Sequence, residues 1–157
     1  MSEFRIVAMP SEVAARFRDG GLDANGQPPE RHISGGDGVP CRHCLTDLAK
    51  GEPFLILAYR PFPEPQPYAE IGPIFLHAEA CRRYEDSSIP AMFLAREKIL
   101  IRGYGADDRI VYGTGKVIPS ADLAEAAASL FRRSEIAYAH LRSASNNCVP
   151  CRLERSE

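Results

Sequence analysis

The sequence predicts an α+β fold in one domain spanning residues 1–157, with a mainly antiparallel sheet and a few short helices. Short apolar stretches with strand character recur along the chain and are separated by turn residues, whereas only a few stretches have helical start and stop signals. The strands are also grouped apart from the helices instead of alternating with them, which favours α+β over a parallel α/β fold. A chain of this length buries roughly 70% of its unfolded surface, enough for one core.

The first quarter of the chain predicts a strand, a helix and a loop. Residues 4–9 (FRIVAM) are apolar enough for a buried strand. A short helix follows over residues 11–18, with Ser11 as its N-cap and the two glycines at 20–21 as its end. Residues 23–40 are rich in Gly, Pro, Asn and Asp, so we expect a long surface loop there.

The middle of the chain predicts two strands, an exposed loop and a helix. Residues 54–59 are apolar almost throughout, which indicates a strand covered on both faces. Residues 61–67 contain four prolines and therefore predict a stiff, exposed loop. A short strand at 73–76 then leads into a helix over residues 78–84.

The last third predicts a hairpin, a helix and a final strand. Residues 99–104 and 109–112 flank the turn sequence GADD, which is typical of a β-hairpin. Ser120 caps an alanine-rich helix that extends to Phe131. The last strand is expected over residues 136–141 and continues into the final cysteine pair.

Cysteine and histidine spacing is the strongest chemical signal in the sequence. Two cysteine pairs have C-x-x-C spacing, and a fifth cysteine follows a histidine by four residues, so that one helical face would hold both. Thiolates and imidazole are the ligands of tetrahedral zinc sites. The candidate ligands are Cys41, Cys44, His77, Cys81, Cys148 and Cys151.

Six candidates exceed the four ligands of one tetrahedral site, so three interpretations remain open. In the first, a module of residues 41–84 binds zinc through Cys41, Cys44, His77 and Cys81, which leaves the C-terminal pair at 148–151 as free or redox thiols. In the second, the two C-x-x-C pairs share the ion. In the third, no metal binds and the cysteines are small apolar core residues.

The order of knuckle, hairpin and second ligand pair resembles treble-clef zinc modules. The elements CRHCL, GE, FLH and Cys81 resemble in particular the zinc finger of poly(ADP-ribose) polymerases, although three residues instead of two separate His77 from Cys81. This resemblance covers about a quarter of the chain and implies a local module without a shared activity.

From Cys41 to the C-terminus, the sequence resembles a bacterial family known as the domain of unknown function 1203. The resemblance is carried by CRHCL, GEPFLILAYRPF, PYAEIGPIFLHAEAC, RGY, RIVYGTG and AHLRSASNNCVPCRLE. It implies one bacterial domain of this length and brings no activity with it.

Composition excludes several classes of protein. The net charge is −2, without an excess of Lys and Arg, so we expect no nucleic-acid partner. No stretch approaches 18 apolar residues and the N-terminus lacks a signal pattern, so we expect neither a membrane span nor export. A cytoplasmic location, which keeps thiols reduced, is the expectation that follows.

A closed site with four protein ligands leaves no position for water, which favours a structural role for the metal. We therefore expect a zinc-stabilised domain that binds a protein partner or a small ligand. The alternatives are a metal- or cysteine-dependent hydrolase or acyl transferase using His77, Cys81 and His140, and a redox protein based on the C-terminal pair. Among the other histidines, His43 is expected to point outward, His32 to be solvated, and His140 to be a hydrogen-bonded core residue.

Overall fold

The computed structural model describes residues 3–148 and 151–157. In chain order its elements are β1 (Phe4–Val7), α1 (Ser11–Arg18), β2 (Glu30–Ile33), β3 (Pro53–Tyr59), β4 (Gly72–His77), α2 (Ala91–Leu94), β5 (Lys98–Tyr104), β6 (Lys116–Pro119), a 3₁₀ turn (Ser120–Asp122) that continues into α3 (Leu123–Phe131), β7 (Tyr138–Ser143) and β8 (Cys151–Arg155).

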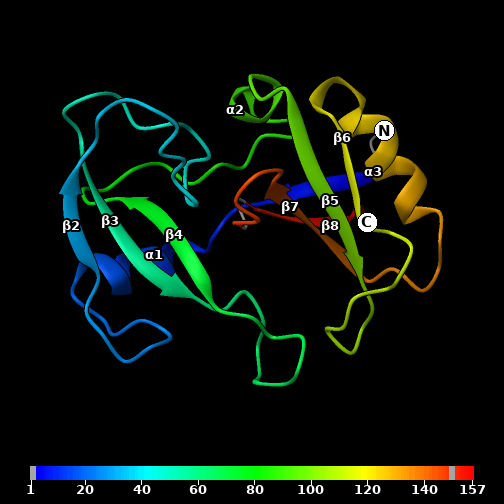
Figure 1. The fold of residues 1–157 in the computed structure, drawn as a ribbon, viewed down its shortest axis with the longest axis horizontal. Coiled ribbons are helices and arrows are strands. Elements are labelled where there is room, and N and C mark those ends of the chain that lie inside the picture. The colour runs from blue at the N-terminus through cyan, green and yellow to red at the C-terminus, as the bar shows by residue number, and fades with distance from the viewer. Residues whose placement is uncertain (1–2, 149–150) are drawn as a thin grey trace.

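The strands form two antiparallel sheets that lie side by side (Figure 1). One sheet has five strands in the order β1-β8-β7-β5-β6, and the other has three in the order β2-β3-β4. Every strand pair in the described part of the chain is antiparallel. The predicted α+β class, mainly antiparallel with a few short helices, is confirmed.

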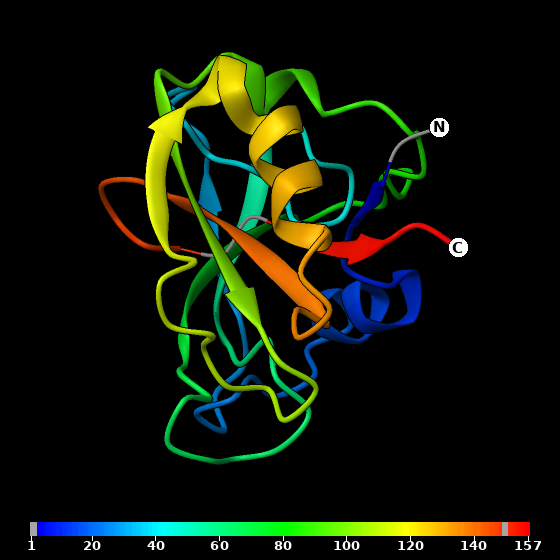
Figure 2. The ribbon, with the colours of Figure 1, turned by 90° about the vertical axis from the view of Figure 1, so that its right-hand side faces the viewer.

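The five-stranded sheet has one apolar face, which α3 covers (Figure 2). The strand register places alternate residues of each strand on this face. The main buried contacts are made by Ile99, Ile101, Leu141, Leu153, Leu123, Ala127 and Phe131. This cluster is the larger of the two main apolar cores of the molecule.

The opposite face of the same sheet is aromatic and polar. Tyr138, His140 and Arg142 alternate along β7 and are all buried. Phe62 lies on this face, with its ring 5.4 Å from that of Tyr104 and 5.3 Å from that of His140. The proline-rich segment is a loop, as predicted. However, Phe62 is only 5% exposed, and through this side chain the loop packs against the sheet.

The three-stranded sheet packs against α1. Phe17 of α1 joins a core with Leu55, Leu57 and Leu76 from β3 and β4. The predicted strands at 54–59 and 73–76 and the predicted helix at 11–18 are confirmed, although Ser11 makes no capping hydrogen bond.

The prediction of a loop at 23–40 missed one strand, because β2 lies within this segment. All four residues of β2 are exposed, so its sequence shows no alternation between buried and exposed positions. The strand is defined instead by its backbone pairing with β3, which carries the apolar side chains.

The predicted helix over residues 78–84 is wrong. This segment is irregular, because its backbone makes hydrogen bonds to distant residues instead of within a helix. The Ala78 N–H donates to the Pro53 carbonyl over 3.1 Å, and the Tyr84 N–H donates to the His43 carbonyl over 2.9 Å. The Arg83 guanidinium also donates to the carbonyls of Ala8 and Met9. These long-range bonds override local helix propensity.

The predicted hairpin is correct for its first strand but wrong for its second. β5 pairs with β6 at 116–119, whereas residues 109–112 contribute only an isolated bridge between Tyr104 and Ile110. The hydroxyl of Ser120 donates to the Arg96 carbonyl, so Ser120 does not cap the helix that follows. Residues 105–115, which connect β5 to β6, form a wide loop that returns the chain to the edge of the sheet.

The C-terminal strands also differ from prediction. β7 begins at Tyr138, two residues later than expected, and β8 was not predicted at all. β8 inserts between β1 and β7 in the sheet, a pairing that joins the two ends of the chain. No helix among residues 3–148 and 151–157 is long and apolar enough to cross a membrane.

Candidate metal centre

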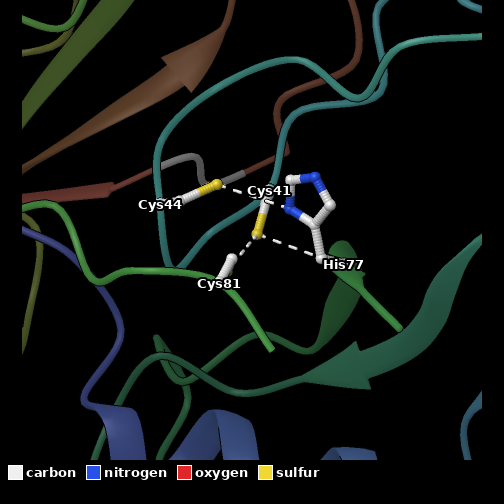
Figure 3. A group of neighbouring side chains, drawn as sticks. All are labelled: Cys41, Cys44, His77 and Cys81. Atoms are coloured by element: carbon white, nitrogen blue, oxygen red, sulfur yellow. Dashed lines mark hydrogen bonds between the residues drawn. The ribbon is translucent and has the colours of Figure 1, made fainter. Parts of the chain in front are cut away.

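One of the two predicted ligand sets is brought together in the structure (Figure 3). Cys41 and Cys44 lie in a tight turn that is closed by the Leu45 N–H donating to the Cys41 carbonyl over 3.0 Å. A bridge between Cys41 and Phe75 holds this turn beside β4. His77 is the last residue of β4, and Cys81 reaches the site from the irregular segment that follows. Three separate segments thus supply the cluster.

Two of the separations between ligand atoms match those of a tetrahedral zinc site. One ligand atom from each of the four residues lies within 4.8 Å of all the others. The Cys41 and Cys81 sulfurs are 3.9 Å apart, and the Cys44 sulfur is 3.4 Å from His77 Nδ1. Zinc–sulfur bonds of about 2.3 Å and zinc–nitrogen bonds of about 2.0 Å require separations of about 3.8 Å and about 3.5 Å, respectively. The four side chains are arranged to hold a metal ion.

Glu52 orients the histidine of the cluster. Its carboxylate Oε2 lies 2.9 Å from His77 Nε2 and accepts a hydrogen bond from the N–H of that nitrogen. The lone pair of Nδ1 is therefore free to bind a metal ion together with the sulfurs. The pKa of His77 is raised by its contact with the Cys41 sulfur and by the Glu52 carboxylate. A histidine that donates its second N–H to a carboxylate is a common arrangement around protein metal ions.

Two further donors surround the Cys81 sulfur. Arg18 Nη2 lies 3.0 Å and His43 Nδ1 lies 3.1 Å from this atom. Burial lowers the pKa of His43, so its ring is neutral. In that state Nδ1–H donates to the sulfur, and Nε2 accepts from the Ser11 hydroxyl over 2.9 Å. Both donors offset the negative charge that three thiolates would bring.

The expectation that His43 points outward is wrong. His43 is 3% exposed, because the turn at Cys41–Leu45 directs it toward Cys81 and α1. Arg18 and Glu52 were not predicted as site residues at all. Neither residue is marked by periodicity or ligand spacing, although Glu52 belongs to the GE element of the zinc-finger resemblance, because each contacts the cluster across more than 20 positions of sequence.

The thiols of the cluster share protons unequally. Hydrogen bonds with Cys44 and Cys81 lower the pKa of Cys41, whereas hydrogen bonds with Cys41 and Cys44 raise the pKa of Cys81. One thiolate is thus stabilised by the thiols beside it. A divalent cation would take the place of the remaining protons, since metal binding by cysteine requires the thiolate.

The C-terminal cysteines do not join this cluster. Cys151 begins β8 and belongs to the apolar core under α3, where burial raises its pKa. Cys148 is half-buried, with its sulfur 3.7 Å from the Asn146 carbonyl oxygen. Neither belongs to the group of metal-ligating side chains among the described residues. Residues 149–150 between them lie outside the described residues.

His140 and His32 lie apart from the metal cluster. His140 is fully buried on β7 and bonded to Arg142, as expected for a core histidine. His32 is exposed at the sheet edge, where its Nε2 lies 2.9 Å from Glu30 Oε1. His140 is therefore not part of a common constellation with His77 and Cys81, the arrangement that the enzyme hypothesis requires.

Comparison with known proteins gives one match. Residues 38–155, about three quarters of the chain, match a family described as "Protein of unknown function (DUF1203)". No curated protein and no solved structure matches the chain. The matched region contains all four residues of the cluster.

Proposed function

The chain belongs to the DUF1203 family, and from this premise we propose that it is a zinc-stabilised domain that binds a protein partner or a small ligand. The observation that carries the proposal is the grouping of three sulfurs and one imidazole nitrogen within 4.8 Å of one another. The ligands are Cys41, Cys44, His77 and Cys81, with Glu52 orienting the histidine.

The chemistry of the ligands favours zinc. Three thiolates and one imidazole form a soft donor set, and tetrahedral sites of this composition are typical of structural zinc. Magnesium and calcium prefer oxygen ligands in larger numbers. The Glu52 carboxylate beside the cluster is engaged by His77 and by the Ala49 N–H.

A structural role is supported by what the cluster connects. The Met9 N–H donates to the Arg42 carbonyl over 3.0 Å, which ties the cysteine turn to the chain between β1 and α1. The Arg42 N–H in turn donates to the Phe75 carbonyl in β4 over 3.1 Å. With four protein ligands, the ion has no open position for a reacting water. The metal would therefore hold these segments in register.

Metal content is the direct test of this proposal. Protein purified under reducing conditions without a tag or chelators should contain about one zinc per chain by elemental analysis. Cys44→Ser and Cys81→Ser should each lower that content, because each removes one of four ligands. Cys151→Ser is the matched control and should retain the metal, since Cys151 packs in the other core.

The opposite results would contradict the proposal. Metal-free wild-type protein with all five thiols titratable and an unchanged melting temperature would exclude a structural ion. Loss of metal in Cys151→Ser but not in Cys81→Ser would move the site to the two C-x-x-C pairs.

A further inference from the structure

A cavity of about 410 Å³ lies between the two sheets. Its walls come from the chain between β1 and α1, the segment after β3, and strands β7 and β8. Pro61 and Phe62 supply apolar surface. The charged and polar residues of the wall include Arg42, Arg60, Arg152, Glu154 and His140.

His140 presents a buried N–H in this wall. Its Nδ1 lies 3.0 Å from Arg142 Nη2, and a guanidinium group only donates hydrogen bonds. Nδ1 must therefore accept, which places the proton of the neutral ring on Nε2. Burial and the nearby Arg142, Arg152 and Arg102 lower the pKa of His140 well below its ordinary value, so the ring is neutral. Nε2 has no hydrogen-bond partner among the described residues.

Arg60 provides a second unpartnered donor at the same cavity. Its Nε is buried and has no hydrogen-bond partner among the described residues. Buried donors in native proteins are almost always satisfied, so two of them on one cavity indicate that something else accepts their hydrogen bonds. Both groups are donors only, which indicates that the missing partner is an acceptor.

The charge of the wall points to an anion. Arg60 and Arg152 line the cavity against one carboxylate, and that carboxylate is already engaged. Glu154 accepts from Arg5 over 2.8 Å and from Arg152 Nε over 2.9 Å. The Arg152 guanidinium is held in place by the Tyr138 ring, whose centroid lies 3.7 Å from its central carbon. Excess positive charge at a partly closed site attracts anions.

We propose that this cavity binds a small organic oxyanion, a carboxylate or phosphate attached to an apolar body. Arg60 and Arg152 would bind its charged group, the Nε2–H of His140 would donate to it, and Pro61 and Phe62 would contact its apolar part. This inference deepens the binding role proposed above by naming the ligand class. It rests on that role and not on the identity of the metal.

The cysteine turn connects this cavity to the metal centre. Arg42 lies between two of the ligands, and its backbone is bonded on one side to Met9 and on the other to Phe75. Arg42 is also one of the residues that line the cavity. Loss of the metal should therefore weaken anion binding as well as loosen the cysteine turn.

The test compares phenyl phosphate, benzoate and uncharged benzamide by titration calorimetry on the zinc-loaded full chain. Phenyl phosphate or benzoate should bind, and benzamide should not; the tighter of the two anions identifies the group. Arg60→Gln should weaken binding roughly ten- to hundredfold, as expected for a lost charge-assisted hydrogen bond. Arg31→Gln is the control, because Arg31 lies on the exposed edge strand β2 and outside the cavity.

Because His140 is fully buried, replacing it would change the packing of the wall as well as its hydrogen bonding, so its role in anion binding is read in the wild type. The imidazole ¹⁵N and ¹H resonances should show a proton on Nε2 that shifts when the anion is added. Anion binding that is unchanged in Arg60→Gln, or equal binding of benzamide, would overturn the inference. So would the absence of anion binding by protein that carries one zinc per chain, which would leave the zinc proposal standing. Anion binding by folded protein that contains no zinc when purified without chelators would support the cavity and contradict the zinc proposal.

Discussion

Replacing Glu52 probes the metal centre without removing a ligand. Its carboxylate accepts from His77 Nε2 over 2.9 Å and thereby selects the tautomer with a free Nδ1 lone pair. In Glu52→Ala this selection is lost, and the imidazole becomes a weaker ligand in a less fixed orientation. Glu52→Gln retains an acceptor but removes the negative charge, so its effect should be smaller.

Loss of a carboxylate behind a metal-ligating histidine typically lowers metal affinity roughly 10- to 100-fold, or about 1.4–2.7 kcal/mol. The Glu52 side chain is 43% exposed, so solvent screens part of its effect. We therefore expect about a tenfold loss of zinc affinity for Glu52→Ala, near the lower limit of that range.

Competition with a chromophoric chelator measures this change directly. Glu30→Ala is a matched control, because Glu30 contacts His32 Nε2 at the same distance of 2.9 Å, on an exposed strand away from the cluster. Its zinc affinity should equal that of the wild type. Equal affinities for wild type and Glu52→Ala would refute the assignment of Glu52 as the residue that orients His77.

Two further predictions concern the stability of the fold. Chelation of the metal should increase amide exchange in residues 41–84 while β5, β7 and β8 remain protected, because the core under α3 does not include the cluster; uniform loss of protection would contradict this. The folded-state pKa of His140 is depressed, so the unfolded chain binds its proton first as the pH falls below about 6.5. The free energy of unfolding should therefore fall by up to about 1.4 kcal/mol per pH unit below that value. Urea titrations of wild type and His140→Gln between pH 7 and 5 would measure it, and identical slopes would be evidence against a buried neutral His140.

The fold class and the best-defined elements could be predicted from sequence, because they depend on local patterns of burial. The apolar run over residues 54–59 lies in β3. The segment at 11–21, which begins with polar residues and ends with two glycines, contains α1. The spacing of Cys41 and Cys44 identified a knuckle for the same reason, since two thiols three positions apart meet within a single turn.

Elements whose stability comes from distant partners could not be predicted in this way. β2 carries only exposed side chains and is a strand through its pairing with β3. β8 is a short C-terminal segment that becomes central by inserting between β1 and β7. The segment at 78–84 has helical composition, but bonds to the carbonyls of Pro53 and His43 hold it in an irregular path.

The choice between ligand sets was likewise made by tertiary structure. Sequence spacing allowed Cys41 and Cys44 to combine either with His77 and Cys81 or with the C-terminal pair. The antiparallel register of β3 and β4 places His77 opposite Phe54, and the bridge to Phe75 draws the cysteine turn to the same end of the sheet.

The residues around the cluster and the cavity follow the same rule. Arg18, Glu52 and the inward-facing His43 meet Cys81 or His77 only once α1, β3 and the cysteine turn have packed together. The sequence by itself thus determined which chemical groups are present and the local structure of the first pair. Only the packing of these elements in the tertiary structure decided which groups meet, because contacts between distant residues leave no periodic signal in the chain.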